Sequence, residues 1–327
     1  MMTQSRTATI ARSLIIPTAM VIGLLLFLEL FEPWRSNLLW RELFNLGHLP
    51  LFGVVSLFVL SMTRLVPALD RSLAGRYAAA FIVAALLAAL SEIVQIGGPR
   101  DADVYDFLRD LVGIVSFLLL WLAFDRRAHS AVGTASRRVI LILIAVALVL
   151  TSASSVIRLS AVWAERDRAV PVLFTFENWW ERPFITADNC VISVVSADMV
   201  WPDSAANHFL QVDYRAALYT GPIFQDFFPD WTGFDTLSLT IVSLSPQPER
   251  ILFRVDDYHT RKDRSDRYER VINLQPGHND IALPLAEIAH GPKGRMLDLS
   301  RVKRIVLFSA SQPRREFSLL FDNFRLR

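Results

Sequence analysis

A run of charged side chains between residues 92 and 110 is the part of this sequence best suited to chemistry. It contains two arginines and five carboxylates. Clustered carboxylates can hold a cation, share a proton as a coupled group, or bind a polar substrate. The run lies between two strongly apolar segments, and an ionisable group at membrane depth costs about 2.5–3.5 kcal/mol on insertion scales. Such groups are seldom kept there without partners or a purpose.

Helical geometry predicts that several of these side chains converge. Successive residues of a helix are turned by about 100°, so Glu92 and Gln95 share one face of their segment. A helix that begins near Asp103 places Asp103, Asp106, Asp110 and Gly113 within an arc of about 80°. The candidate polar site comprises Glu92, Gln95, Arg100, Asp103, Asp106, Asp110 and His48, with Arg109 beside them.

These residues allow two interpretations. In the first, Arg100 and Arg109 pair with neighbouring carboxylates and fasten two helices together. In the second, the carboxylates that outnumber the arginines serve a cation, a proton or a polar substrate, and Asp106 and Asp110 could hold a hydrated divalent ion. His48 is either a ligand or base in this site, or a helix-capping or interfacial histidine.

The elements that must position the site are long apolar segments in the first half of the chain. The chain has 327 residues, 53% of them hydrophobic, and the apolar residues are concentrated before residue 160. A membrane-spanning helix needs about 20 apolar residues. Five segments reach this length and predict an all-α bundle of five spans, at residues 13–31, 47–66, 77–96, 107–124 and 139–157.

The arginines predict the orientation of these spans. They gather in the N-terminal segment and in the second and fourth loops, whereas the first and third loops hold few. By the positive-inside rule the N-terminus lies in the cytoplasm, and five crossings place the C-terminal half and the carboxylate-rich loop outside. The predicted location is the cytoplasmic (inner) membrane.

The polar pattern resembles that of the VanZ-like membrane protein family over residues 15–125. Where that family usually has Asn, this chain has Asp110, which raises the negative charge of the site. The resemblance implies a role at the bacterial envelope, since the family is similar to a protein associated with reduced sensitivity to glycopeptide antibiotics, but it supplies no chemistry. The resemblance is carried by Glu92, Gln95, Arg100, Asp103, Asp106, Asp110, Gly113, His48 and Phe52.

The second half of the chain reads as short alternating segments separated by turn residues. Beyond a charged connector at 158–168, about nine strands predict an antiparallel sandwich or jelly roll. The predicted strands are residues 172–176, 191–195, 209–214, 236–242, 251–255, 270–274, 279–284, 304–309 and 318–324.

This half resembles galactose-binding-like jelly rolls, which occur as carbohydrate-binding modules. The motifs that carry the resemblance are residues 174–177, 231–237, 256–257, 274–279 and 320–326. In such folds the first and last strands are neighbours, which would bring Glu177 near Asp322. The resemblance implies a structural Ca²⁺ in that region. The alternative is that the two residues are ordinary polar side chains on edge strands.

Aromatic residues are frequent in the loops of this half, and exposed rings can stack on sugar faces. Trp179, Trp180 and Tyr258 are the candidate glycan-binding residues, whereas Trp231 is expected in the core. The charged stretch 256–270 is predicted to be a mobile, solvated hairpin loop that could also grip an anionic glycan. No nucleophile set and no pair of catalytic carboxylates stands out here, which argues against a glycosidase.

Charge and cysteine content exclude other classes. The formal net charge of +2 and the lack of a basic patch among aromatic residues argue against a nucleic-acid partner. The single cysteine, Cys190, excludes an intrachain disulfide and a cysteine-based metal site. The second half must therefore fold on its hydrophobic core alone.

Together these features predict a multidomain bacterial membrane protein. A transmembrane bundle at 1–160 would present an outward-facing polar site to a lipid-linked or headgroup substrate. An external jelly roll at 170–327 would bind an envelope polysaccharide or a lipid-linked sugar. The alternative is a non-enzymatic anchor or assembly factor for envelope polysaccharide whose polar cluster is purely structural. An ion-coupled transporter ranks last, because the polar residues gather at one face of the bilayer.

Overall fold

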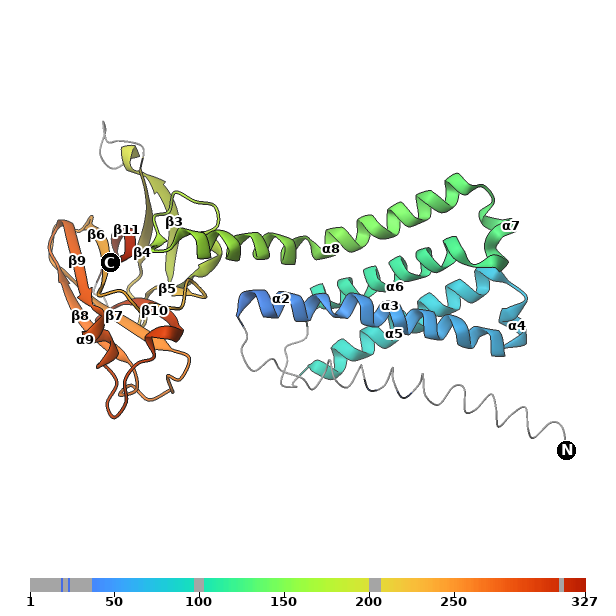
Figure 1. The fold of residues 1–327 in the computed structure, drawn as a ribbon, viewed down its shortest axis with the longest axis horizontal. Helices are drawn as coiled ribbons and strands as arrows, with labels where there is room; N and C mark the ends of the chain where they lie inside the picture. The colour runs from blue at the N-terminus through green and yellow to red at the C-terminus, as the bar shows by residue number, and fades with distance from the viewer. Residues whose placement is uncertain (1–18, 20–22, 24–36, 97–102, 200–206, 312–314) are drawn as a thin grey trace. The chain divides into compact units, whose positions relative to one another are not determined.

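The chain divides into two compact units, Met1–Leu159 and Ser160–Arg327. The computed structural model describes residues 19, 23, 37–96, 103–199, 207–311 and 315–327 (Figure 1). In these residues the first unit is helical and the second is built from antiparallel strands.

Helices of the first unit begin at capping side chains. Asn37 accepts a hydrogen bond from the Trp40 backbone N–H, Ser72 accepts one from Gly75, and Asp103 accepts one from Tyr105. Such caps satisfy N–H groups that have no partner within the helix. The helical elements are α2 Leu38–Leu46, α3 His48–Met62, η1 Thr63–Leu65, α4 Pro67–Asp70, α5 Leu73–Gln95, α6 Val104–Phe124, η2 Arg126–Ala128, α7 His129–Val132 and α8 Ala135–Ala169.

Four described helices are long and apolar enough to cross a membrane: Leu38–Leu65, α5, α6 and α8. They correspond to the last four of the five predicted spans. The first predicted span, 13–31, lies outside the described residues apart from Ala19 and Gly23.

The predicted charged connector at 158–168 is helical, because α8 continues through it to Ala169. No Pro or Gly interrupts residues 135–170, and most of the charged residues there are good helix formers. Glu165 and Arg168, one helical turn apart, are joined by a salt bridge of 2.7 Å.

Helices α3, α5 and α6 pack side by side (Figure 1). Ala80, Ala84 and Ala88 form a fully buried row on α5 that leaves room for the neighbouring helices. On α6, Gly113 lies against the α3 backbone so closely that an added Cβ would be 2.1 Å from the Leu49 carbonyl oxygen. Small residues thus set the distance between these helices.

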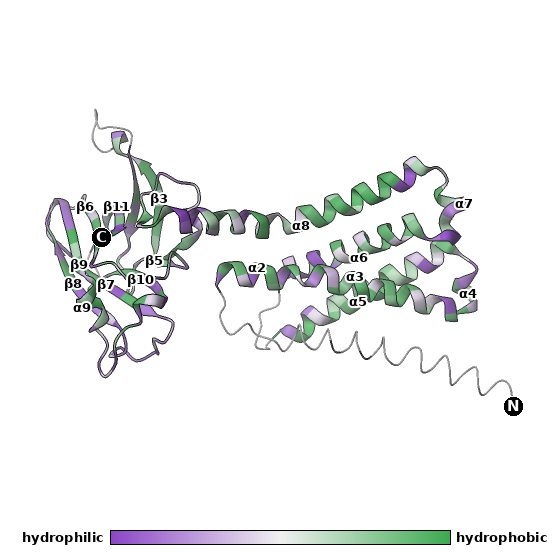
Figure 2. Cartoon of the chain, viewed as in Figure 1, coloured by the Kyte–Doolittle hydropathy of each residue, from purple (hydrophilic) through white to green (hydrophobic). Residues whose placement is uncertain are grey.

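In α8 the apolar residues are largely uncovered. Only 6% of its most apolar 18-residue window is buried in the structure, and Figure 2 shows hydrophobic residues along most of the helix. A helix that is apolar on all faces belongs in a protein core or in lipid. Among the residues that the structure describes, the protein core does not provide that cover for α8.

The second unit is a sandwich of two antiparallel sheets. One sheet has the order β3-β4-β11-β6-β9 with β1 also paired to β11, and the other has the order β2-β5-β10-β7-β8. The strands are β1 Val172–Phe174, β2 Ile185–Asp188, β3 Cys190–Ser196, β4 His208–Tyr214, β5 Gly221–Gln225, β6 Thr236–Ser243, β7 Glu249–Asp257, β8 Tyr268–Leu274, β9 Gly277–Pro284, β10 Val302–Ser309 and β11 Phe317–Leu326.

The sequence prediction found nine of these strands and missed β2 and β5. β2 has four residues, and β5 begins with Gly221 and Pro222, which are turn signals in a sequence. Each pairs with the other, and β5 also pairs with β10. Their strand conformation is therefore decided by tertiary pairing and not by local preference.

Two predictions about the sandwich are confirmed. The first and last strands are neighbours, with Val172 opposite Arg325. Trp231 is fully buried in the core between the sheets. The end of α8 belongs to the same unit, since Val162 is part of this core and Trp163 packs edge-on against Phe184.

We predict that Gly113→Ala weakens the helical unit. The new methyl group would meet backbone atoms of Leu49, which cannot move without separating α3 from α6, and overpacking of this kind costs about 1–3 kcal/mol. Thermal unfolding of the detergent-solubilised protein should show a lower midpoint. The matched control is Ala78→Leu on the exposed face of α5, and equal midpoints for both variants and the native chain would contradict the packing.

Candidate functional site

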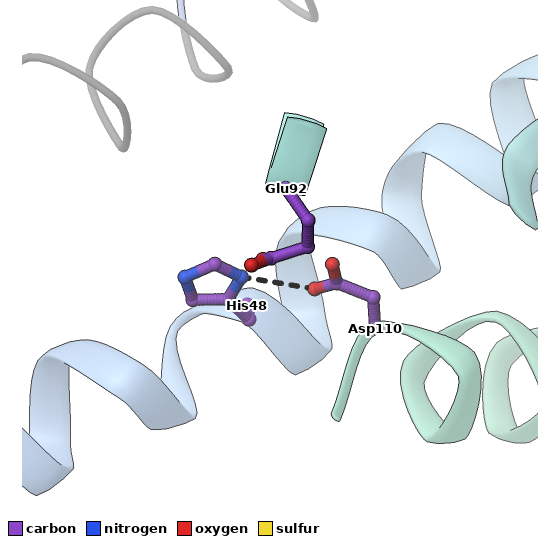
Figure 3. Close-up of side chains that lie close together, drawn as sticks. All are labelled: His48, Glu92 and Asp110. Carbon is purple, nitrogen blue, oxygen red and sulfur yellow. Dashed lines mark hydrogen bonds and ion pairs between the residues drawn. The ribbon is translucent and has the colours of Figure 1, made fainter. Parts of the chain in front are cut away.

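His48, Asp110 and Glu92 bring three helices of the first unit together (Figure 3). His48 is the first residue of α3, Glu92 lies in the last turn of α5, and Asp110 lies in the second turn of α6. His48 Nδ1 is 3.0 Å from Asp110 Oδ1, and both side chains are fully buried. One ligand atom from each of the three residues lies within 4.8 Å of the others.

Glu92 also joins the end of α5 to the start of α6. Its Oε2 atom accepts a hydrogen bond of 3.0 Å from the backbone N–H of Asp103. The Asp103 carboxylate caps α6 by accepting from Tyr105 N–H. The carboxylates that flank the turn are therefore used in part to hold the two helix ends in register.

A second set of contacts extends from the cluster to α2 and α8. Arg109 donates to Asp106 Oδ1 at 2.6 Å and to Glu42 Oε2 at 3.3 Å. Ser155 of α8 donates to the same Glu42 oxygen at 3.0 Å. Asp106 Oδ2 is also 3.8 Å from His48 Nε2. Arg109 thereby fastens α6 to α2 and, through Glu42, to α8, whereas the fastening interpretation had the arginines join α5 to α6.

The structure places the predicted polar residues as follows. His48, Glu92, Asp103, Asp106 and Asp110 come together at one end of α3, α5 and α6. Gln95 is buried in the last turn of α5. The predicted contribution of Arg100 lies outside the described residues.

Sequence reasoning missed Glu42, which joins the cluster from α2. The only sequence signal was its place beside Arg41 in an otherwise mostly apolar segment, six positions before His48. Its partner Arg109 is 67 positions away, and no local pattern predicts such a contact.

An apolar groove of about 260 Å³ opens beside Glu92 and Asp103, between α5 and α6. Its walls are Ala89, Ile93, Ile96, Val104 and Phe107. The groove has the chemistry of a site for a hydrocarbon chain whose polar end reaches the two carboxylates.

In the sandwich, a network of charged side chains lies on the outward face of the five-stranded sheet. Residues alternate along β7, so Phe253 and Val255 enter the core while Arg254 and Asp256 face outward. Asp256 is 1% exposed; Arg254 donates to it at 2.6 and 2.7 Å, and Arg304 of β10 donates at 2.5 Å.

A groove of about 270 Å³ continues this face toward two aromatic rings. Tyr219 is 69% exposed, and its ring meets that of Phe308 edge-on with centroids 6.1 Å apart. Arg254, Arg267 and Glu269 also line the groove. Sequence reasoning missed it because its residues come from four separated segments.

Tyr258 lies at the end of β7 beside a polar hollow of about 740 Å³. Its ring is 38% exposed, with the Lys303 ammonium 6.0 Å from the ring centroid. Charged side chains of both signs line the hollow, with Arg261, Lys293 and Arg295 beside Asp263 and Asp266.

The prediction that stretch 256–270 is a mobile hairpin loop was wrong for its ends. Arg295 binds both Asp257, at 2.5 and 3.0 Å, and Asp266. Asp257 is fully buried and also accepts from Asp298 N–H, His259 N–H and Thr260. These contacts fix the loop because they satisfy a buried charge that has no access to water.

Trp179 and Trp180 have different environments. Trp179 is 61% exposed, whereas Trp180 is 5% exposed and packs with Phe184 in the sandwich core. A ring must present an open face to stack on a sugar. Of this pair, Trp179 meets that requirement.

Glu177 and Asp322 each have protein partners. Glu177 Oε2 is 2.7 Å from His208 Nδ1, while Asp322 accepts from Asn207 and Asn323. Asp322 is nearly buried, and burial raises its pKa while these hydrogen bonds and Arg325 lower it. The calcium implied for this pair stays a prediction.

Neither a family model nor a curated protein matches the chain, and the comparison with solved structures finds carbohydrate-binding modules and enzymes that contain similar parts. A family 11 carbohydrate-binding module from Clostridium thermocellum, in complex with a mixed-linked tetrasaccharide, is similar at 16% identity and a TM-score of 0.37 over 48% of this chain and 94% of its own. The xylan-binding CBM22-1 domain from Paenibacillus barcinonensis matches at 13% identity and a TM-score of 0.30, over 44% of this chain and 84% of its own.

A third match is an exo-β-agarase, at 18% identity and a TM-score of 0.37 over 48% of this chain. This chain spans a quarter of the agarase. The matched part is the sandwich, and the likeness extends to the fold alone. The VanZ-like resemblance of the helical half stays a prediction.

We predict that Asp257 gives the sandwich an acid-sensitive part of its stability. Burial raises its pKa, but the hydrogen bonds from Arg295, Asp298 N–H and Thr260 outweigh that effect and leave the pKa at about 2. Its unfolded value is about 3.9. Because the folded pKa is the lower one, about 2 kcal/mol of stability is present above pH 4 and is lost as the pH falls toward 2.

Asp257→Asn in residues 160–327 should therefore lower the free energy of unfolding at pH 7 by about 2 kcal/mol or more. The difference from the native fragment should shrink between pH 4 and pH 2, measured by denaturant titration. Glu316→Gln, at an exposed position, is the control. A difference that stays constant across this pH range would contradict the assignment.

Proposed function

We propose that this chain is an envelope membrane protein whose external sandwich binds a glycan. In this proposal the polar cluster of the helical unit receives the headgroup of a lipid or of a lipid-linked sugar. The observation that carries the proposal is the outward face of the β2-β5-β10-β7-β8 sheet, where exposed aromatic rings flank a fixed set of charged groups.

Glycan binding is supported by the chemistry of that face. Sugar rings present apolar C–H faces and hydroxyl edges, so they bind where aromatic rings and rigid polar groups alternate. Tyr219 and Phe308 supply the rings at one end, and Tyr258 supplies one at the end of β7. Between them, Arg254 and Arg304 are held rigid by Asp256.

Membrane insertion is supported by the uncovered apolar surface of the helices. The four candidate spans have mean hydropathies between 1.9 and 2.7, and α8 is apolar over most of its length with little protein cover. In water such a surface would associate with other apolar surfaces, whereas lipid satisfies it without further contacts.

A lipid-linked substrate is supported by the apolar groove between α5 and α6. The groove ends at Glu92 and Asp103, so a hydrocarbon chain in it would place its headgroup beside the polar cluster. The Asp106–Arg109–Glu42 contacts favour the structural role for these three residues. His48 and Asp110 are not used by that fastening and are the better candidates for contact with a substrate.

We predict that purified 160–327 binds an acidic or neutral envelope polysaccharide through the Tyr219 face. The fragment includes Val162 and Trp163 because they complete its core. Tyr219→Ala should weaken binding about 2- to 13-fold, since one stacked ring contributes about 0.5–1.5 kcal/mol. Isothermal titration against a panel of envelope polysaccharides and lipid-linked sugars measures the effect.

Two further variants test which surface of the sandwich binds the glycan. Val194→Ala, on β3 of the other sheet, should leave affinity unchanged. Loss of binding in Trp179→Ala with full binding in Tyr219→Ala would move the site to the Trp179 loop. A folded fragment that binds no member of the panel would overturn glycan binding.

We also predict that the sandwich lies outside the cytoplasmic membrane. Arg126, Arg127, Arg137 and Arg138 precede the apolar part of α8 and favour a cytoplasmic start of that helix. Alkaline phosphatase fused after Arg327 should be active, and a fluorescent protein that folds only in the cytoplasm should be dark there. The reverse pattern would contradict the orientation.

A further inference from the structure

We propose that His48, Glu92 and Asp110 bind a divalent transition-metal cation of the Zn²⁺ or Mn²⁺ type. The three residues come from α3, α5 and α6, and their side chains point toward one another (Figure 3). One ligand atom of each lies within 4.8 Å of the others. A six-coordinate cation with bonds of about 2.1 Å spans about 4.2 Å between opposite ligands, so small side-chain movements would close the site.

Within the described part of the chain, a buried carboxylate oxygen of this cluster lacks a hydrogen-bond partner, and a bound cation would supply a partner. Asp110 is fully buried, and its Oδ2 atom has no hydrogen-bond partner among the described residues. A buried polar atom without a partner costs about 1–3 kcal/mol, and more when it carries charge.

The number of protons on the two ring nitrogens of His48 leads to the same conclusion. Nδ1 faces the Asp110 carboxylate at 3.0 Å, and Nε2 faces the Asp106 carboxylate at 3.8 Å. A neutral imidazole carries one proton, so one of its nitrogens presents a lone pair toward a carboxylate. A cation between Nδ1 and the oxygens of Asp110 and Glu92 would turn that repulsion into coordination.

The donor set is suited to a first-row metal. Imidazole nitrogen favours Zn²⁺ and Fe²⁺, and carboxylate oxygen favours Mn²⁺ and Mg²⁺, so one nitrogen with two carboxylates fits the ions between these preferences. Three protein ligands leave positions open for water or a substrate oxygen. The site would thereby offer a Lewis acid at the end of the apolar groove.

The surroundings of His48 match those of a metal-bound histidine. Such a histidine usually donates its second ring N–H to a carboxylate, which fixes the ring. Asp106 occupies that position at 3.8 Å from Nε2, and Arg109 holds Asp106 in place at 2.6 Å. Asp106 and Arg109 would thus be positioning residues for the metal ligand.

Metal binding to the full-length protein tests this inference and does not depend on glycan binding by the sandwich. The protein, purified in detergent without a polyhistidine tag and stripped with EDTA, is titrated with Zn²⁺ or Mn²⁺. We expect one tightly bound equivalent after desalting, by elemental analysis. Pulsed electron paramagnetic resonance of the Mn²⁺ form should show coupling to one histidine nitrogen.

Matched variants identify the ligands. His48→Gln and Asp110→Asn should each weaken binding at least 100-fold, and Asp106→Asn about 10–100-fold, as expected for a group that orients a ligand. His129→Gln, at an exposed position in α7, should bind metal as the native protein does.

The inference is overturned if the folded native protein retains no metal, or if His48→Gln retains a full equivalent. If the His48 and Asp110 variants fail to fold, Glu92→Gln and the nitrogen coupling of the native Mn²⁺ form decide the question. A native form that lacks this coupling contradicts histidine ligation.

Discussion

The helical unit depends on the burial of charged and polar groups inside an otherwise apolar bundle. His48 and Asp110 have no exposed surface, and Asp106 is 3% exposed. Each group must be satisfied by a neighbour, because water is excluded and an unpaired buried charge costs several kcal/mol. This requirement ties α3 to α6 through His48 and ties α2 and α8 to α6 through Glu42 and Arg109.

Close packing makes these polar contacts possible. Gly113 and the alanine row of α5 let three helices approach until short side chains from different helices can meet. Larger residues at these positions would separate the helices and leave Asp110 without His48. The polar contacts therefore depend on the small residues, because close helix packing brings the charged side chains within reach of one another.

The sandwich also buries two carboxylates, and different arginines pair with them. Asp256 and Asp257 are adjacent and both buried, yet alternation along β7 sends them in opposite directions. Asp256 pairs with Arg254 and Arg304 on the outward face, and Asp257 pairs with Arg295 at the end of the strand. The first pairing stiffens the proposed glycan face, and the second fixes the loop beside Tyr258.

The sequence by itself determined the two halves, four of the apolar helices, nine strands and the polar residues that face one another near Glu92 and Asp110. These follow from segment length, from periods of 3.6 and 2, and from capping residues, which are local properties. Only the tertiary structure decided that β2 and β5 are strands and that Glu42 joins the cluster. It also decided that Trp180 is covered while Tyr219 is open. Contacts between residues far apart in the chain depend on packing distances, and no local pattern encodes those.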